Sequence, residues 1–248
     1  MKLYGDFTEE DWLHAVGILK HHVPDALIVH GEWNHADNIN KWKGILSQEM
    51  LLPKWNTVIG RNKAVLTGFA NVYGGAMAAA VSHQFAAMGT DIFIQTGYFG
   101  GLSAKVNYGD ILIVTEAKMD DGVSAAYLPG CETVTSDEEL AMRAIEFCQK
   151  KNYKYVTGSV LSVSTPYLET EKMVQAWSTA GHLGVDMESA VTLAVANKFN
   201  KKAVSLLNLS DHLLKGDTFY SYSKEREAIE AEIDERIRDI ALYLGRSF

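Results

Sequence analysis

Short apolar runs alternate along this chain with longer stretches whose apolar residues recur at helical spacing. The apolar runs predict strands at residues 25–30, 63–68, 91–97, 110–117, 155–164 and 203–210. The longer stretches predict helices at residues 71–88, 136–150, 169–180, 187–199 and 223–244. Strands that alternate with helices are typical of an α/β fold, in which helices cover both faces of a largely parallel sheet.

No internal repeat, low-complexity tract or long linker interrupts this pattern, and only four prolines occur. We therefore expect residues 1–248 to form a single domain. In open α/β sheets, ligands bind beyond the carboxyl ends of the strands. Three segments are predicted to lie there, at residues 96–101, 185–188 and 209–212, and two of them carry acidic side chains.

Composition narrows the partners that we expect. A net charge of −8 repels phosphate backbones, which argues against nucleic acid. No apolar run reaches the length of a membrane span, and the polar N-terminus lacks the apolar core of a signal peptide. With only Cys131 and Cys148, a disulfide framework is excluded. These features predict a cytoplasmic protein that binds neither membrane nor nucleic acid.

The stretch LGVDMESA places two acids, Asp186 and Glu188, where a predicted strand gives way to a helix. One interpretation is helix capping, with Asp186 as the N-cap and Glu188 interacting with the helix dipole. The other is ligand binding, because one carboxylate can accept two hydrogen bonds from a vicinal diol such as the 2′,3′-hydroxyls of ribose. By pattern alone, capping is the more common case.

A second acid, Asp211, follows the predicted strand 203–210 in the sequence SDH. It suits either a turn or a general acid, because a carboxyl group shielded from water has a raised pKa and donates a proton more readily. The glycines of QTGYFGGL suit either a tight turn or a binding loop. The histidines near the N-terminus match no known ligand spacing, so we predict no metal site and no cofactor.

Five motifs in order resemble the nucleoside phosphorylase family, which includes purine nucleoside phosphorylases, uridine phosphorylases and methylthioadenosine nucleosidases. They are IVHG, IFIQTGYFGGL with NYGDILIV, SVSTPYLE, LGVDMESA and LSDH. The most specific of them are VDMESA and LSDH. The resemblance implies a three-layer α/β/α sandwich around a mixed, mostly parallel and partly barrel-like sheet. It also implies an enzyme that cleaves the N-glycosidic bond of a nucleoside, most simply a purine nucleoside.

The resemblance further implies roles for individual residues. Glu188 would bind the ribose hydroxyls, Met187 would pack under the sugar, and Asp211 would protonate purine N7 with help from Arg226. The remaining substrate-binding residues implied in this way are Asp186, Pro166, Tyr167, Gly97 and Tyr98.

The sequence departs from the family at the phosphate site, which this resemblance places at Gly31, His35 and Gln95. Phosphorylases hold phosphate there with arginines, whereas His35 and Gln95 stand near those positions here, and Tyr98 replaces a serine. Loss of two fixed cations removes the bidentate contacts that a phosphate dianion needs. We therefore favour hydrolysis, with Glu32, His35 or Asp37 as the residue that activates water.

Two alternatives remain open at this point. One is phosphorolysis to ribose 1-phosphate, with inorganic phosphate as the second substrate and a rebuilt anion site. The other is a non-catalytic nucleoside-binding or storage protein of the same fold. The resemblance also implies a homodimer or a homohexamer, because family members of this type form dimers or trimers of dimers.

Overall fold

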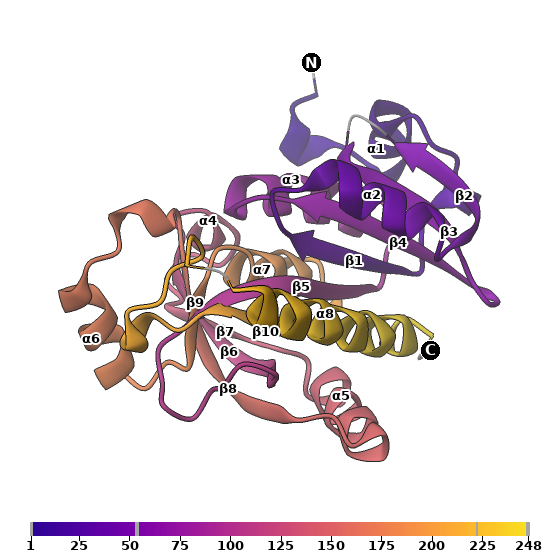
Figure 1. Cartoon of the computed structure of the whole chain (residues 1–248). Helices are drawn as coiled ribbons and strands as arrows, with labels where there is room; N and C mark the ends of the chain where they lie inside the picture. The colour runs from indigo at the N-terminus through magenta and orange to yellow at the C-terminus, as the bar shows by residue number, and fades with distance from the viewer. Residues whose placement is uncertain (1, 53–54, 222, 247–248) are drawn as a thin grey trace.

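The structure is a computed structural model that describes residues 2–52, 55–221 and 223–246 (Figure 1). Its α-helices are α1 (Glu9–Val16), α2 (His35–Lys43), α3 (Gly75–Met88), α4 (Ser124–Tyr127), α5 (Glu138–Lys151), α6 (Glu171–Thr179), α7 (Ser189–Lys198) and α8 (Lys224–Leu244). Its strands are β1 (Ala26–Gly31), β2 (Ser47–Leu52), β3 (Thr57–Asn62), β4 (Val65–Val72), β5 (Ile92–Gly101), β6 (Ile111–Asp120), β7 (Thr133–Thr135), β8 (Tyr155–Val163), β9 (Gly184–Asp186) and β10 (Lys202–Asp211).

Within the described residues, all ten strands belong to one mixed sheet. Strands β4, β1, β5 and β10 are parallel neighbours in that order, and β3 and β2 continue the sheet beyond β4 in antiparallel pairings. Strand β10 pairs with both β5 and β6, so β10, β6, β8, β9 and β5 close into a ring of paired strands. The mixed, partly barrel-like sheet implied by the sequence is therefore present.

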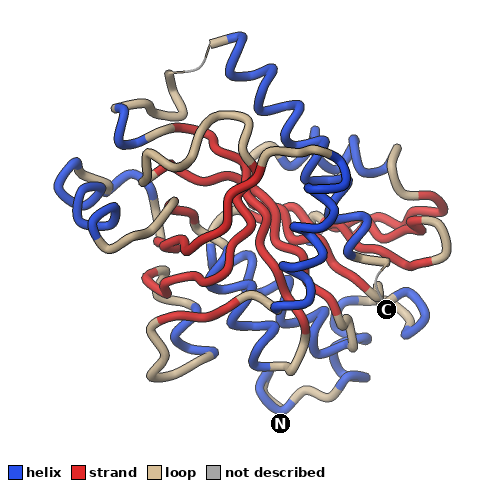
Figure 2. The backbone as a smooth tube through the Cα atoms, turned by 90° about the horizontal axis from the view of Figure 1, so that it is seen from below, coloured by secondary structure: helices blue, strands red, loops and turns tan. Residues whose placement is uncertain are grey.

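Side chains alternate between the two faces of the sheet and form two large apolar cores. Phe93 of β5 belongs to one core, and its neighbours Ile92 and Ile94 belong to the other. The first core includes buried residues of α3 and α7, and the second includes buried residues of α2, α5 and α8. Figure 2 shows the strands running through the middle of the molecule with helices around them. This arrangement confirms the predicted α/β fold with helical layers on both sides of the sheet.

The two longest predicted helices differ in how much of their surface is buried, as their sequences require. Helix α3 is rich in alanine, and small side chains allow it to pack closely against α7. Helix α8 buries one stripe that includes Ile233, Ile237 and Ile240, while charged residues face outward. Its first turn is capped by the Ser223 hydroxyl, which accepts a hydrogen bond from the backbone N–H of Arg226.

The predicted elements are present, with corrected boundaries. Residues 98–101 were expected to form a loop after a strand, but they continue β5 because their backbone pairs with β9 and β10. Residues 71–72 were assigned to a helix, but they end β4, and α3 begins at Gly75. Helices α1 and α2 and strands β2 and β3 were not predicted, because their sequences are short and polar or lack a clear period.

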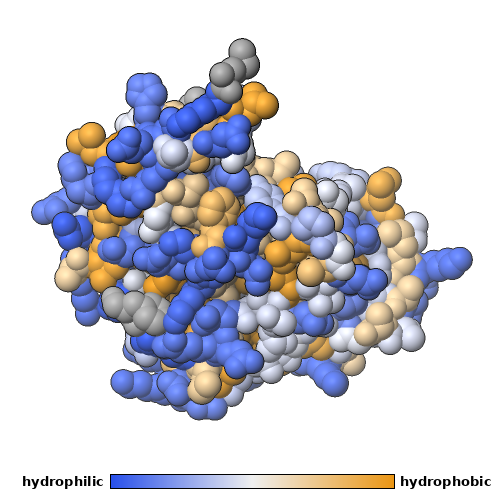
Figure 3. All heavy atoms as spheres, turned by 180° about the vertical axis from the view of Figure 1, so that it is seen from behind, coloured by the Kyte–Doolittle hydropathy of each residue, from blue (hydrophilic) through white to orange (hydrophobic). Residues whose placement is uncertain are grey.

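None of the helices in the described part of the chain is long and apolar enough to cross a membrane. Figure 3 shows the face opposite to that of Figure 1, where hydrophilic residues cover much of the surface and apolar residues are scattered among them. Such a surface is expected for helices that turn their apolar stripe toward a central sheet.

Candidate active site

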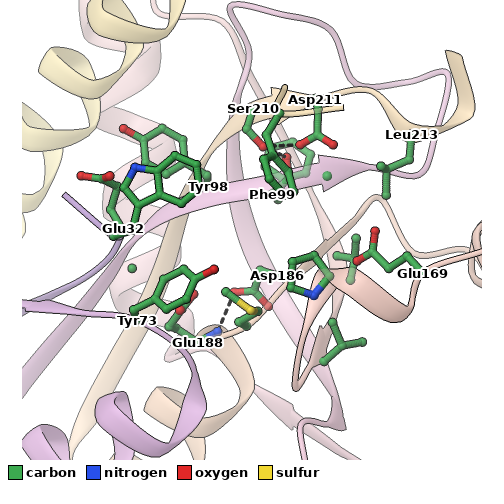
Figure 4. Close-up of a pocket in the computed structure, with 18 of the residues that line it drawn as sticks. Glu32, Tyr73, Tyr98, Phe99, Glu169, Asp186, Glu188, Ser210, Asp211 and Leu213 are labelled. Carbon is green, nitrogen blue, oxygen red and sulfur yellow. Dashed lines mark hydrogen bonds between the residues drawn. The ribbon is translucent and has the colours of Figure 1, made fainter. Parts of the chain in front are cut away.

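A pocket of about 400 Å³ lies beyond the carboxyl ends of β1, β5, β9 and β10 (Figure 4). Its walls come from segments that are far apart in the sequence. The lining residues are Gly31, Glu32, Trp33, Tyr73, Tyr98, Phe99, Gly100, Val163, Pro166, Glu169, Val185, Asp186, Met187, Glu188, Ser210, Asp211, Leu213, Phe219, Glu227 and Glu230.

Strand pairing explains why these segments meet. Gly100 of β5 pairs with Val185 of β9 on one side and with Asp211 of β10 on the other. The β5–β10 register shifts between Leu209 and Asp211, and such bulges often re-aim side chains at sites of function. The two acidic segments predicted from the sequence thus flank the same strand, and both line one pocket.

Glu188 lines one end of the pocket, which we call the sugar end because the resemblance implies that Glu188 binds ribose. Its side chain is buried, and Oε1 accepts a hydrogen bond of 2.6 Å from the backbone N–H of Gly74. Burial, followed by the charge of Asp186, raises the pKa of Glu188 to about 8. Tyr73 lies directly above it in Figure 4. A carboxyl group anchored through one oxygen keeps its other oxygen for a ligand.

Gly31, at the end of β1, packs against this carboxyl group. A Cβ atom at Gly31 would lie 2.5 Å from Glu188 Oε2 and 2.7 Å from Cδ, which is too close for real atoms. Any side chain here would displace Glu188. The requirement for glycine at this position therefore comes from the sugar end, in addition to any role in binding an anion.

Asp186 borders the pocket, but its hydrogen bonds lead into the protein. One oxygen accepts from the Ser162 hydroxyl at 2.5 Å, and the other accepts from the backbone N–H groups of Glu188 and Ser189 at 3.4 and 2.8 Å. These contacts fix the start of α7. The N-cap position of α7 is Glu188 and not Asp186 as predicted, and the Glu188 side chain makes no capping hydrogen bond. Asp186 instead accepts from the backbone at the helix start from two residues before that position, while Glu188 lines the cavity.

Asp211 lies away from Glu188 at the other end of the pocket, which we call the ring end because the resemblance implies that Asp211 protonates the base. Its Oδ1 accepts a hydrogen bond of 2.5 Å from the hydroxyl of Ser210. Burial raises the pKa of Asp211 to about 6, although the Ser210 hydrogen bond and the charge of Arg226 oppose that shift. An aspartic acid with a pKa near neutrality is suited to give a proton to a leaving group.

Arg226 supports Asp211 from behind and does not line the pocket itself. Its guanidinium lies 4.7 Å from the centre of the Tyr108 ring, and Nη2 donates a hydrogen bond to the carbonyl oxygen of Ser210. Nη1 donates to the carbonyl oxygen of Ser221 at 2.8 Å. Arg226 thus ties the end of β10 to the segment before α8 and places a positive charge near Asp211.

The pocket is strongly acidic. Seven of its lining residues are carboxylic acids, and none of the twenty is lysine, arginine or histidine. The acids are Glu32, Glu169, Asp186, Glu188, Glu227, Glu230 and Asp211. Without a fixed cation, this wall offers no charged partner to a phosphate dianion.

Aromatic rings line much of the remaining wall, from Trp33, Tyr73, Tyr98, Phe99 and Phe219. The Tyr98 hydroxyl donates a hydrogen bond of 2.7 Å to Asp234 of α8, and Asp234 also accepts from the side chain of Asn208. Tyr98, which by the resemblance replaces a serine of the family, is therefore held in place at the pocket wall. Flat apolar surfaces next to carboxyl groups suit a ligand with a planar ring and hydroxyl groups.

Several predicted site residues lie elsewhere. Gln95 is fully buried beneath α7, where its side-chain oxygen accepts hydrogen bonds from Ser189 and Ser205. Gly97 pairs with Gly31 but does not line the pocket, and a Cβ atom there would lie 2.8 Å from the carbonyl oxygen of Gly31. Gln95 was predicted at the phosphate site and Gly97 at the substrate site, but β5 turns both residues toward the interior of the protein and not toward the pocket.

Of the three residues considered for water activation, one lines the pocket and two do not. Glu32 lines the pocket, and its carboxylate accepts hydrogen bonds from the Asn34 N–H at 2.8 Å and from the Asn38 side chain. His35 and Asp37 do not line it, since His35 contacts Asn71 and Asp37 accepts from the Asn34 side chain.

Of the predicted substrate-binding residues Pro166 and Tyr167, one lines the pocket and the other does not. Pro166 lines the pocket, whereas Tyr167 is 65% exposed and lies outside the lining, with its ring 6.4 Å from that of Phe219. Met187 lines the pocket beside Glu188, and its place under a sugar stays a prediction.

Sequence reasoning missed Glu169, Trp33, Phe219 and the two acids of α8. Phe219 belongs to the aromatic run TFYSY between the SDH motif and the last helix, and that run was a usable signal. Glu169 is the last residue of the SVSTPYLE motif and the first residue of the predicted helix 169–180, and a single acid at the start of a helix is most simply a surface residue. Among the described residues, no cluster of histidine, cysteine or acidic side chains could hold a metal ion.

The chain is similar to known proteins of one superfamily. A family model described as the phosphorylase superfamily matches residues 53–244. The chain is 31% identical over 130 residues to a DeoD-type purine nucleoside phosphorylase of Clostridium beijerinckii, an alignment that covers 52% of this chain and 55% of that protein. It is 29% identical over 154 residues to a DeoD-type purine nucleoside phosphorylase of Myxococcus xanthus, covering 62% and 64% of the two chains. The alignments thus span less than two thirds of these relatives.

The likeness in fold covers more of the chain than the likeness in sequence does. The crystal structure of uridine phosphorylase from Vibrio fischeri superimposes with a TM-score of 0.82 at 20% identity, covering 94% of this chain and 96% of that one. At this identity, the superposition shows a common fold, and the chemistry has to be argued from the residues in the pocket.

Proposed function

Because the chain belongs to the phosphorylase superfamily, we propose that it is an enzyme that cleaves the N-glycosidic bond of a purine nucleoside by hydrolysis. One observation carries the choice of hydrolysis. None of the residues that line the pocket, all within the described part of the chain, is a basic side chain, whereas seven are acids. Phosphate would have to enter this pocket against negative charge, while water enters without such a cost.

The ring end provides the acid. As the glycosidic bond breaks, electrons flow into the base, and a proton from Asp211 to a ring nitrogen neutralises the leaving group. Such general-acid assistance contributes about 10²–10⁴-fold to the rate. Arg226 holds the backbone next to Asp211 and limits the rise of its pKa. Leu213 and Pro166 line the same cavity and provide apolar surface for a planar base.

The sugar end provides orientation and charge. Glu188 accepts the ribose hydroxyls, with Met187 beside it and Tyr73 above it. An ionised Glu188 also stabilises the positive charge that develops on the sugar as the base leaves. Gly31 leaves the space in which this carboxyl group sits.

The water that completes hydrolysis requires an acceptor for its proton. Glu32 is the candidate that borders the cavity, whereas His35 and Asp37 lie outside it. The hydrogen bonds from Asn34 and Asn38 hold the Glu32 carboxylate in one position, and a carboxylate oxygen that accepts one hydrogen bond still has a lone pair for water. Glu32 therefore acts as the general base.

The decisive measurement is base release from inosine and adenosine in phosphate-free buffer, with ribose and ribose 1-phosphate quantified as products. Hydrolysis predicts free ribose at a rate that is independent of added phosphate. Release that requires phosphate and gives ribose 1-phosphate would overturn the proposal. Tight nucleoside binding with no product under either condition would instead identify a binding or storage protein.

Phosphorolysis is the second candidate, because both curated relatives described above carry the name purine nucleoside phosphorylase. It would require a cation from outside the lining described here. A second copy of the chain is one source, in the homodimer or homohexamer that the resemblance implies. Sedimentation of the active enzyme, combined with the phosphate assay, connects the assembly state to the reaction.

A further inference from the structure

Tyr108 lies behind the ring end, and the reaction proposed above does not use it. It belongs to the turn of residues 107–110 between β5 and β6 and does not line the pocket. In this turn the backbone N–H of Asp110 donates to the carbonyl oxygen of Asn107 at 3.0 Å, and the Asp110 carboxylate accepts from the Asn107 N–H at 2.9 Å. Gly109 supplies the positive φ of 96° that a turn of this kind needs at its third position. The turn therefore holds Tyr108 on a fixed backbone.

The hydroxyl of Tyr108 connects this turn to the residue that follows Asp211. It accepts a hydrogen bond of 3.1 Å from the backbone N–H of His212 and donates one of 2.7 Å to the carboxylate of Asp217. The backbone N–H of Asp217 in turn donates to the carbonyl oxygen of His212 at 3.3 Å. Burial, followed by the hydrogen bond to Asp217, raises the pKa of Tyr108. The hydroxyl therefore stays protonated at neutral pH and keeps both hydrogen bonds.

The ring of Tyr108 supports the residue that precedes Asp211, and it does so through Arg226. The guanidinium of Arg226 lies 4.7 Å from the centre of the Tyr108 ring, and its Nη2 donates to the carbonyl oxygen of Ser210. A cation over an aromatic ring is attracted to the electron-rich face of that ring. Asp211 thus has a hydrogen-bonded peptide group on each side, because Arg226 holds the one before it and Tyr108 holds the one after it.

This support matters because the strand is irregular at Asp211. The register of β10 against β5 shifts between Leu209 and Asp211, and a bulge interrupts the ladder of backbone hydrogen bonds. The direction of the Asp211 side chain therefore depends on the contacts just described. A misplacement of about 1 Å can cost about 10²-fold in rate. We propose that Tyr108 is a positioning residue for Asp211, with its hydroxyl and its ring fixing the peptide groups that aim the acid at the base.

This proposal rests on the proposed function, in which Asp211 protonates the leaving base. Tyr108→Phe removes the hydroxyl and keeps the ring, so it releases only the peptide group that follows Asp211. For inosine, kcat should fall about threefold to thirtyfold, while KM should change less than about twofold because Tyr108 lies outside the pocket lining. A variant with the wild-type kcat on inosine would overturn the proposal.

A second substrate separates placement of the acid from a general disturbance of the site. The base of 7-methylinosine already carries a positive charge and leaves as a neutral molecule, so its release needs no proton. On 7-methylinosine, kcat of Tyr108→Phe should stay within about twofold of the wild type. Likewise, adding Tyr108→Phe to Asp211→Asn, which lacks the acid, should change the residual kcat on inosine less than about twofold. Losses as large as that of the single variant on inosine would assign Tyr108 a merely structural role.

Two further variants make the result specific. Tyr108→Leu also removes the ring and frees Arg226, so its loss on inosine should exceed that of Tyr108→Phe, and an equal loss would reject the part assigned to the ring. Tyr127→Phe is the matched control, because it removes another partly buried hydroxyl, 3.2 Å from His83 Nδ1 and outside the pocket lining. Its kcat should stay within about twofold, and a loss as large as that of Tyr108→Phe would contradict the proposal.

Amide hydrogen exchange tests the same contact without turnover. In Tyr108→Phe the His212 amide should exchange about threefold to tenfold faster than in the wild type, because it loses its hydrogen-bond partner. The amides of β1, which pairs with the other edge of β5, should keep their rates. Unchanged exchange at His212 would reject the proposal whatever the protein catalyses. Faster exchange in a protein that releases no base from any nucleoside would reject the proposed function and leave the contact confirmed.

Discussion

The two ends of the pocket hold their acids in different ways. At the sugar end, Glu188 is anchored by the backbone N–H of Gly74 and enclosed by Gly31, so its position is set by main-chain atoms. At the ring end, Asp211 is held by the neighbouring Ser210 hydroxyl, whereas no side-chain hydrogen bond found within the described part of the chain anchors Glu169. A rigid sugar end suits recognition of a constant ribose, and an acid held through side chains at the ring end can adjust as a proton is transferred.

Removing the acid at the ring end should have the largest effect. Asp211→Asn keeps the size of the side chain but cannot give a proton to the base, so kcat should fall about 10²–10⁴-fold. Steady-state kinetics on inosine measures this loss, and a thermal unfolding curve shows whether the variant is folded. A folded variant that keeps more than about a tenth of the wild-type kcat would assign the proton to another group.

The residue proposed to activate water should come next. Glu32→Gln removes the proton acceptor at the pocket wall, and kcat for hydrolysis should fall about 10²–10³-fold. Asp37→Asn is the matched control, because Asp37 lies in the same segment but outside the pocket, and its effect should stay within about twofold. Equal losses in the two variants would point to folding of the 32–38 segment instead of catalysis.

The role of Glu188 at the sugar end can be tested with substrates that differ in their ribose hydroxyls. Glu188→Gln weakens a hydrogen bond between a carboxylate and two hydroxyls, so kcat/KM for inosine should fall about tenfold to a hundredfold. The 2′-deoxy substrate makes only part of this contact, and its loss should be smaller. The comparison of inosine with 2′-deoxyinosine measures the difference, and equal losses would place the sugar elsewhere in the pocket.

The pH profile should separate the two ends. Catalysis needs protonated Asp211, with a pKa of about 6, and ionised Glu188, with a pKa of about 8. The rate follows the protonated fraction of Asp211 multiplied by the ionised fraction of Glu188. This product rises up to about pH 6, is flat between about pH 6 and pH 8, and falls above about pH 8. In Glu188→Gln only Asp211 titrates, so log kcat/KM should fall from about pH 6, and that fall should begin roughly two pH units lower than in the wild type. An unchanged upper limb would contradict these assignments.

Asp186 should affect stability more than activity, although it is only two residues from Glu188. Asp186→Asn places an amide where a carboxylate accepts from Ser162 and from two backbone N–H groups, which should cost about 1–3 kcal/mol. For a chain of this size, that cost lowers Tm by about 3–10 °C. Calorimetry measures the shift, while KM for inosine well below Tm should change less than about threefold.

The amino-acid sequence by itself determined the layers of the fold. Short apolar runs that alternate with striped or apolar helices bury their apolar surface when helices cover both faces of a sheet. It also singled out the acids of LGVDMESA and LSDH, because buried strands rarely end in carboxyl groups without a reason. Only the tertiary structure decided which acid faces the cavity. Asp186 and Glu188 differ by backbone geometry at the start of α7, and that geometry depends on Ser162 of another strand.

The two acids at the ring end and the fate of the predicted anion site were also decided by the tertiary structure. Glu169 and Asp211 line one pocket because the turn after β8 and the end of β10 lie near each other in the fold, and the sequence contains no sign of that proximity. Gln95 turned out to be a core residue because β5 presents it to Ser189 and Ser205. Local patterns fix which residues form elements, whereas the sharing of one cavity depends on strand order and register, which are set by contacts between distant segments.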